Sequence, residues 1–226
     1  MKKIKQFLDY ASTQEEAVLT YHASDMILAI HSDASCLSEA KARSRAGGHF
    51  FMSNNNDDPP HPNNGAVLNI AQIIRAVMTS ACEAEIGAMY INGREAVPTR
   101  KTLKELGHPQ PRTPMQTDNT AAQAVVANNV QPKRTKAMDM RFHWLRYRAA
   151  QKQFRIYWRR GPSNRGDCWT KHFAGPHHRI IRPEILTPRC QLDDLRRRQQ
   201  RAQKVYEIAQ ALVETAGRSL PATRVC

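Results

Sequence analysis

The chain has 226 residues and a formal net charge of +14, with 41% hydrophobic and 24% charged residues. This length and composition allow a packed core for one ordinary domain with extensions, so wholesale disorder is not expected. The longest apolar run, Met26 to Ile30, is far shorter than the ~20 residues of a membrane span, and the N-terminus lacks the apolar centre of a signal peptide. We therefore expect an intracellular protein, cytoplasmic or nuclear, with no membrane partner.

The first half of the chain predicts a short helix and then three strands. The helical pattern within residues 1–24 is too short to make a domain. Residues 26–33 form an apolar run that ends on a carboxylate, and residues 47–52 and 66–74 have the pattern of two further strands. A polar, proline-rich loop over residues 54–64 separates the last two. Three strands in series joined by loops predict an antiparallel meander.

The second half predicts helices that alternate with two more strands. Residues 80–106 carry apolar residues at helical spacing, and Pro98 should kink or split that helix. The other expected elements are a strand over 114–118, helices over 120–127 and 135–150, a strand over 154–158 and a short helix near Asp167. This order predicts an α/β fold with a mixed five-stranded sheet, three antiparallel strands followed by parallel ones, and helices on both faces.

Residues 25–175 are expected to form the domain, with residues 1–24 before it and a linker and amphipathic helical tail over residues 176–226. The tail helix is expected over residues 192–216. Its alanine-rich seam could form a short coiled coil, but Arg198 interrupts the seam, which favours a helix that docks on its own domain.

Basic residues gather in the second half of the chain. Between Lys133 and Arg182 there are fourteen lysines and arginines against two acids, interleaved with eight aromatic residues. A basic, aromatic stretch suits a polyanion such as nucleic acid, whose condensed counterions are released on contact. The alternative is a solubilising face whose aromatic residues belong to the core.

Three carboxylates occupy positions where a structural role is hard to supply. Asp33 and Asp118 each end an apolar strand, and Glu85 shares a helix face with small and apolar residues. Such a carboxylate is costly unless it is paired, protonated or bound to a cation, and Asp167 can join as a fourth ligand of a hard divalent ion. Taken singly, each acid is better explained by an ordinary role, as a helix cap for the aspartates or an arginine partner for Glu85, but the four together in this element order favour a metal site.

The five cysteines are odd in number and contain no C-x-x-C pair, so disulfides are not expected. A zinc site remains an alternative that matches no familiar ligand spacing; its candidate ligands are Cys168, His172, His177, His178 and Cys190.

Several motifs resemble, in the same order, the ribonuclease H region of copia-type LTR retrotransposon polyproteins. They are residues 31–35 (HSDAS), 80–85 (SACEAE), 117–119 (TDN), 133–143 (KRTKAMDMRFH) and 166–171 (GDCWTK). The resemblance covers residues 21–172. It implies the ribonuclease H fold, a site for two Mg²⁺ ions with Mn²⁺ as an alternative, and cleavage of the RNA strand of an RNA/DNA hybrid.

Carried over by position, the catalytic and metal-binding residues that the resemblance implies are Asp33, Glu85, Asp118 and Asp167. Glu85 is preferred to Glu83 because the family's glutamate is followed by a bulky residue and then by small ones, as Glu85 is here. The residues expected to contact nucleic acid are Lys133, Arg134, Lys136, Arg155, Arg159 and Arg160.

Residues 1–24 resemble the family's connector from reverse transcriptase, while the paired aspartates of a polymerase are not recognisable, so no reverse transcriptase domain is expected in this chain. Pro98 and Gly166 depart from the family's pattern, as expected of a decaying copy. The alternative function is therefore a weak or inactive relic that acts as a basic nucleic-acid-binding module. Replacing Pro98 by tyrosine and Gly166 by alanine is expected to raise the melting temperature and the nuclease rate together.

Overall fold

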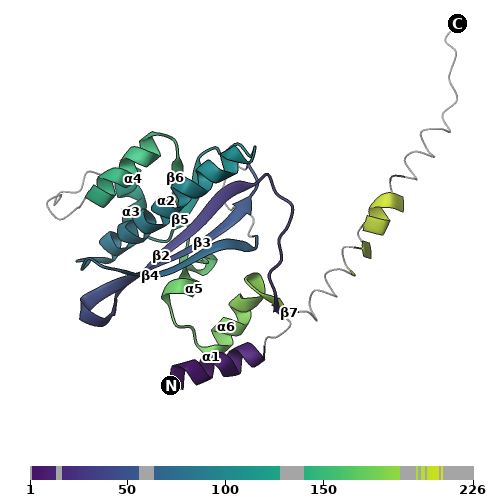
Figure 1. Cartoon of the computed structure of the whole chain (residues 1–226), viewed down its shortest axis with the longest axis horizontal. Coiled ribbons are helices and arrows are strands. Elements are labelled where there is room, and N and C mark those ends of the chain that lie inside the picture. Colours follow the sequence, from purple (N-terminus) through teal and green to yellow (C-terminus); the bar gives the residue numbers. More distant parts are fainter. Residues whose placement is uncertain are drawn as a thin grey trace, which may run out of the picture. The chain divides into compact units, whose positions relative to one another are not determined.

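The fold is described from a computed structural model (Figure 1). The structure describes residues 2–13, 17–55, 64–127, 140–188, 197, 200, 201, 203–208 and 210. The chain divides into two compact units. One unit is Thr20–Ile181, and the other combines the chain ends, Met1–Leu19 and Arg182–Cys226.

The larger unit is built on a mixed five-stranded sheet. Its strands, in chain order, are β2 (Ile27–Glu39), β3 (Arg43–Ser53), β4 (Ala66–Ile74), β5 (Thr113–Thr117) and β6 (Phe154–Trp158). In space the order is β4-β3-β2-β5-β6; β4, β3 and β2 pair antiparallel, and β2, β5 and β6 pair parallel. This arrangement confirms the predicted fold class, with its antiparallel meander and its parallel second half.

The central strands are hydrophobic on both sides because both faces of the sheet are covered. Residues Ile27–Ile30 at the start of β2 are all buried, as expected of a strand that lies between two layers. The edge strand β4 is buried only at every fourth residue, at Ala66, Ile70 and Ile74. The burial pattern of each strand therefore follows its position in the sheet.

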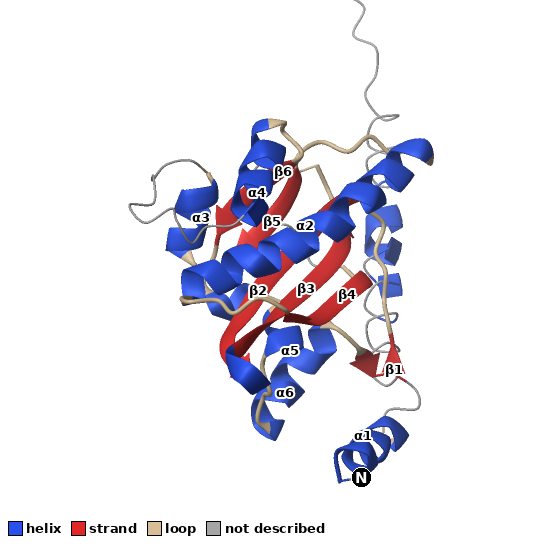
Figure 2. Ribbon diagram, turned by 60° about the vertical axis from the view of Figure 1, so that its left-hand side comes forward, coloured by secondary structure: helices blue, strands red, loops and turns tan. Residues whose placement is uncertain are grey.

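Three helices cover one face of the sheet (Figure 2). They are α2 (Ala81–Glu105), α3 (Thr120–Val126) and α4 (Met140–Ala150). The N-cap residue of α2 is Ser80, whose hydroxyl accepts from the backbone N–H of Glu83 at 3.2 Å. This layer and the sheet share the main core, which contains Leu28, Ile30, Phe50, Met89, Met115, Leu145 and Phe154.

The opposite face carries the short helix α5 (Asp167–Thr170), followed by α6 (Gly175–Ile181). Two adjacent glycines in β3 show how closely the two layers approach the sheet. A Cβ on Gly47 would lie 2.5 Å from the carbonyl oxygen of Gly166, just before α5, while a Cβ on Gly48 would meet the Asn92 side chain of α2. Successive residues of a strand point to opposite faces, so β3 needs both glycines to admit a helix on each side.

The described elements also include three short 3₁₀ segments, η1 (Ala40–Ala42), η3 (Gly161–Ser163) and η4 (Arg182–Glu184). The smaller unit contains α1 (Lys2–Ser12), all of whose residues are exposed. It also contains β1 (Ala17–Val18), which pairs antiparallel with β7 (Thr187–Pro188). No helix in the described part of the chain is both long and apolar enough to cross a membrane.

The sequence predicted that Pro98 would either kink or split its helix, and the structure shows that the helix is not split. The helix α2 continues from Ala81 to Glu105 with Pro98 inside it. Beyond the proline, Arg100 and Leu103 are buried against the rest of the domain, and Ala96 is buried just before it. Packing on both sides of Pro98 therefore offsets the local cost of a proline inside a helix.

Candidate active site

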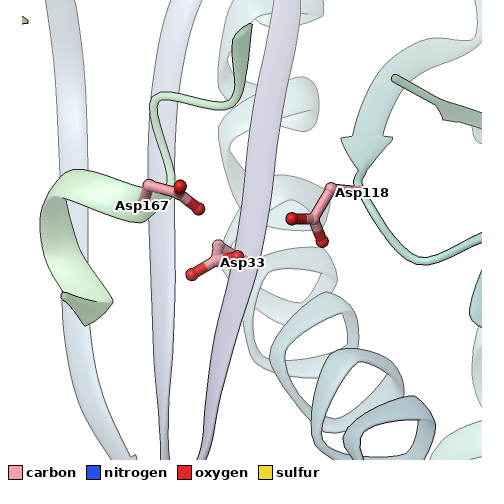
Figure 3. Close-up of side chains that lie close together, drawn as sticks. All are labelled: Asp33, Asp118 and Asp167. Atoms are coloured by element: carbon pink, nitrogen blue, oxygen red, sulfur yellow. The ribbon is translucent and has the colours of Figure 1, made fainter. Parts of the chain in front are cut away.

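Three aspartates converge beside the middle of the sheet (Figure 3). Asp33 comes from β2, Asp118 follows β5 directly, and Asp167 is the first residue of α5. One carboxylate oxygen from each lies within 4.8 Å of the others. Among the described residues this is the one such group of histidine, cysteine or acidic side chains. Cys190, a residue of the alternative zinc site, lies outside the described residues.

Asp33 and Asp118 meet because β2 and β5 are parallel neighbours. Ile30 pairs with Met115 and His31 with Gln116, so each aspartate follows the last of these pairs by two residues. The carboxyl ends of parallel strands lie at the same edge of a sheet, where open α/β sheets bind their ligands. The convergence of these two carboxylates follows from the strand order.

Asp167 is brought to the other two by the turn that precedes α5. The Asn164 side-chain amide donates to the carbonyl oxygen of Ser32 at 2.8 Å, and the Arg165 backbone N–H donates to Nδ1 of His31 at 3.1 Å. Asn164 and Arg165 are both buried. These contacts fix the turn against β2 immediately before Asp33.

Glu85 lies on α2 and joins the two strands that carry the first two aspartates. Its Oε1 accepts from the backbone N–H of Ala34 at 3.0 Å, and its Oε2 accepts from the hydroxyl of Thr117 at 3.1 Å. Glu83, in contrast, is engaged at the start of the helix, where it accepts from the backbone N–H and hydroxyl of Thr79 at 2.7 Å. Of the two glutamates, only Glu85 contacts the strands of the site.

The carboxylates raise one another's pKa. Burial, followed by the charges of Asp33 and Asp118, raises the pKa of Glu85 to about 9. Burial and then the charge of Asp167 raise the pKa of Asp33 to about 6, and burial together with Asp33 raises the pKa of Asp118. At neutral pH such a group of acids must hold protons or be neutralised by a cation. The oxygen donors are all carboxylates, which suit a hard divalent ion.

Two residues that follow Asp167 also contact the site, and the sequence did not assign them a role. The hydroxyl of Thr170 donates a short hydrogen bond to Oδ2 of Asp33. Nζ of Lys171 lies 2.8 Å from Oδ1 of Asp167 and 3.6 Å from Oδ1 of Asp33. The signal was present in the threonine and lysine of the motif at residues 166–171, but their contacts depend on how that segment turns.

The structure separates the basic residues that were expected to contact nucleic acid. The indole N–H of Trp158, next to Arg159, donates to the carbonyl oxygen of Asp118 at 2.9 Å, so Arg159 and Arg160 follow β6 at the end beside the site. Arg155 lies near the other end of β6 and, with Arg112 and Arg146, lines a cavity of about 480 Å³. The three remaining candidates, Lys133, Arg134 and Lys136, lie outside the described residues.

No family model matches the chain. The retrovirus-related Pol polyprotein from transposon TNT 1-94 of Nicotiana tabacum is 26% identical over 168 residues, which are 74% of this chain and 12% of that protein. The chain thus spans a small part of that relative's length.

Two solved structures are similar over 64% of this chain, each with a TM-score of 0.45. LC11-RNase H1, isolated from compost, is 10% identical with 92% of its chain covered, and the N-terminal RNase H domain of a Mycobacterium tuberculosis protein is 13% identical with 91% covered. The sequence match to the tobacco polyprotein confirms the predicted resemblance to retrotransposon polyproteins, and the observed mixed five-stranded sheet has the α/β architecture that this resemblance implies.

Proposed function

We propose that this domain is a metal-dependent endonuclease of copia type that hydrolyses the RNA strand of RNA/DNA hybrids. The observation that carries the proposal is the group formed by Asp33, Asp118 and Asp167, the aspartate cluster, in which one carboxylate oxygen from each residue lies within 4.8 Å of the others. Structural carboxylates are normally paired with a cation or separated, because mutual repulsion is costly where burial also disfavours charge. A site that gathers them is suited to bind cations.

The aspartate cluster and Glu85 would hold two Mg²⁺ ions, or Mn²⁺ in their place. Hard carboxylate oxygens are the donors that these ions prefer. When bound, a pair of such ions activates a water molecule and stabilises the leaving oxygen of a phosphodiester. Glu85 is fixed by two hydrogen bonds to the strands, so it can hold a constant position when substrate arrives.

The burial of the acids indicates the side from which substrate enters. Asp33 is 1% exposed, whereas Asp118 and Asp167 are partly exposed. Asp33 therefore forms the floor of the site, and the other two aspartates face the solvent. A phosphodiester can approach from that side.

The end of β6 is suited to bind the nucleic acid backbone beside the acids. Arg159 and Arg160 follow Trp158, which is hydrogen-bonded to the main chain at Asp118. Arginines contribute affinity through phosphates, and the 2′-hydroxyl allows a protein to distinguish RNA from DNA. The partner that this chemistry recognises is an RNA/DNA hybrid, which would be met in the cytoplasm or nucleus.

A cleavage assay tests the proposal. The purified chain is incubated with Mg²⁺ and a labelled RNA/DNA hybrid, beside duplex DNA, single-stranded RNA and a sample in EDTA. We expect cleavage of the RNA strand of the hybrid alone, abolished by EDTA. Equal cutting of duplex DNA, or cutting that survives EDTA, rejects the assignment. Tight binding of the hybrid without cleavage supports the alternative of a nucleic-acid-binding relic.

A further inference from the structure

Lys171 places a positive charge directly against the aspartate cluster. Its Nζ is hydrogen-bonded to Oδ1 of Asp167 at 2.8 Å and lies 3.6 Å from Oδ1 of Asp33. Burial lowers the pKa of Lys171, but its hydrogen bond to Asp167 and the charges of Asp33, Asp167 and Asp118 outweigh burial and raise that pKa. One ammonium group therefore interacts with all three members of the cluster.

The backbone around Lys171 is held by hydrogen bonds, whereas its long side chain is partly exposed to solvent. The Lys171 backbone N–H donates to the carbonyl oxygen of Asp167 at 3.0 Å, and the preceding residue, Thr170, is hydrogen-bonded to the buried carboxylate of Asp33. The side chain of Lys171 is 42% exposed. A long flexible stem on a fixed backbone lets the ammonium leave the cluster for solvent without disturbing α5.

The ammonium and a divalent ion cannot share this position. Mg²⁺ binds carboxylate oxygens at about 2.0–2.1 Å, so an ion on Asp167 would lie within a few ångströms of Nζ. Like charges at that separation repel, and both compete for the negative charge of Asp167 and Asp33. Binding of a metal between these two aspartates requires that Lys171 move away.

We propose that Lys171 is a built-in counter-ion: it neutralises the aspartate cluster when no metal is bound, and it must be displaced before a divalent ion binds between Asp33 and Asp167. This inference rests on the proposed function, because it assigns Lys171 a regulatory role at the same metal site. Lys171 stabilises the metal-free domain and at the same time weakens metal binding. Lys171 affects metal binding only through the charges of Asp33 and Asp167.

Two properties of the purified chain test this role: the Kd for Mn²⁺, measured by titration calorimetry, and the melting temperature in EDTA. In Lys171→Met we expect Mn²⁺ to bind about tenfold more tightly, since no charge-assisted hydrogen bond has to be broken first. The same variant should melt at a lower temperature in EDTA, because the clustered carboxylates lose their counter-charge. Lys171→Arg, which keeps the charge, should restore both properties toward the parent values.

Lys101→Met is the matched control. Lys101 also forms an ion pair, with Glu105 at 3.7 Å, and its side chain is 79% exposed on α2. The substitution removes the same charge and one ion pair outside the site, so Mn²⁺ affinity and the melting temperature in EDTA should stay near the parent values. Lys171→Gln is a second neutral variant, to be used if Lys171→Met does not fold.

The outcomes separate this inference from the proposed function. If the parent binds Mn²⁺ and the neutral variants bind it no more than twofold more tightly, the inference is overturned while the metal site stands. A raised KM for hybrid with an unchanged Mn²⁺ Kd overturns it too, since it would make Lys171 a substrate contact. If neither the parent nor any variant binds Mn²⁺, the proposed function fails and this inference fails with it.

Discussion

The backbone N–H of Arg165 donates to Nδ1 of His31 at 3.1 Å, which ties the turn before Asp167 to the strand that carries Asp33. This contact requires Nδ1 to be an acceptor, so the His31 ring is the neutral tautomer that carries its proton on Nε2. Gly166, the next residue, passes so close to β2 that it leaves no room for a side chain. The distance between the two acids therefore depends on a glycine and a neutral histidine.

Gly166→Ala should lower the stability of the folded domain. This corrects the expectation from the sequence that alanine at this position would raise the melting temperature. A Cβ on Gly166 would lie 2.9 Å from both the backbone nitrogen and Cβ of Asp33. Because backbone cannot yield as a flexible side chain does, we expect Gly166→Ala to lower the free energy of unfolding by about 1–3 kcal/mol and to weaken Mn²⁺ binding. Thermal melting with and without Mn²⁺ checks both effects, and an unchanged or higher melting temperature would contradict the close approach.

Tyrosine at position 98 should have the opposite effect. Pro98 is exposed and lies inside the continuous helix α2, where it removes one backbone hydrogen bond. We expect Pro98→Tyr alone to raise the free energy of unfolding, by up to about 3 kcal/mol. Denaturant unfolding of the single variant provides the measurement. A loss of stability would show that α2 is adapted to its proline.

Much of the fold was predictable from hydrophobic patterning, because most elements are bounded by polar or turn residues. The strands β4 (Ala66–Ile74) and β6 (Phe154–Trp158) have the bounds that their apolar runs predict. The strand β2 continues to Glu39, beyond the expected end at Asp33, because it forms a long antiparallel pair with β3. Pairing of that kind depends on a partner strand, which the pattern of one segment does not reveal.

The sequence indicated the acidic residues of the candidate site, but it did not indicate the residues that hold these acids in place. The motifs at residues 31–35 and 166–171 identified Asp33 and Asp167 as candidates, and their role as metal ligands is a proposal. The contacts of His31 and Asn164 depend on a turn that folds back on residues more than 130 positions earlier in the chain. Spacing in the sequence carries no information about such a contact, so these residues could be identified only from the structure.

Without metal, the domain should lose stability as the pH rises. Glu85 has its pKa raised to about 9 and Asp33 to about 6, so the folded state keeps protons that the unfolded chain has already lost. In this pH range the unfolded state binds fewer protons, and the free energy of unfolding falls by at most about 1.4 kcal/mol per pH unit for each such proton. We expect the melting temperature in EDTA to fall from about pH 4 to about pH 9; Asp33 contributes to the fall up to about pH 6, and Glu85 accounts for it above that pH.

Glu85→Gln and added Mg²⁺ both test the origin of this pH dependence. The glutamine cannot ionise, so its variant should show a flatter decline in melting temperature with pH. Mg²⁺ replaces the protons, so it should stabilise the parent more at pH 8 than at about pH 6. A parent whose melting temperature in EDTA is constant across this range would show that the raised pKa values are not present in solution.

Hybrid binding should weaken steeply with salt, and the arginines beside Asp118 should account for part of that dependence. Replacing Arg159 and Arg160 by alanine should reduce the slope of log K against log salt by up to about 2, since each phosphate contact contributes about 0.9. Arg155→Ala, at the other end of β6, should reduce it less. Binding isotherms at several salt concentrations provide the slopes, and equal slopes for parent and double variant would make these arginines a solubilising surface.

The most direct test of the central claim, that the aspartate cluster holds the ions that cleave RNA, is the Mg²⁺-dependent rate of hybrid cleavage by Asp118→Asn beside Glu83→Gln. Asp118 is a partly exposed member of the cluster, whereas Glu83 is engaged with Thr79 at the start of α2. We expect Asp118→Asn to lose more than about a hundredfold in rate while it binds hybrid at least as tightly as the parent, and Glu83→Gln to stay near the parent rate. A near-normal rate for Asp118→Asn would contradict the claim.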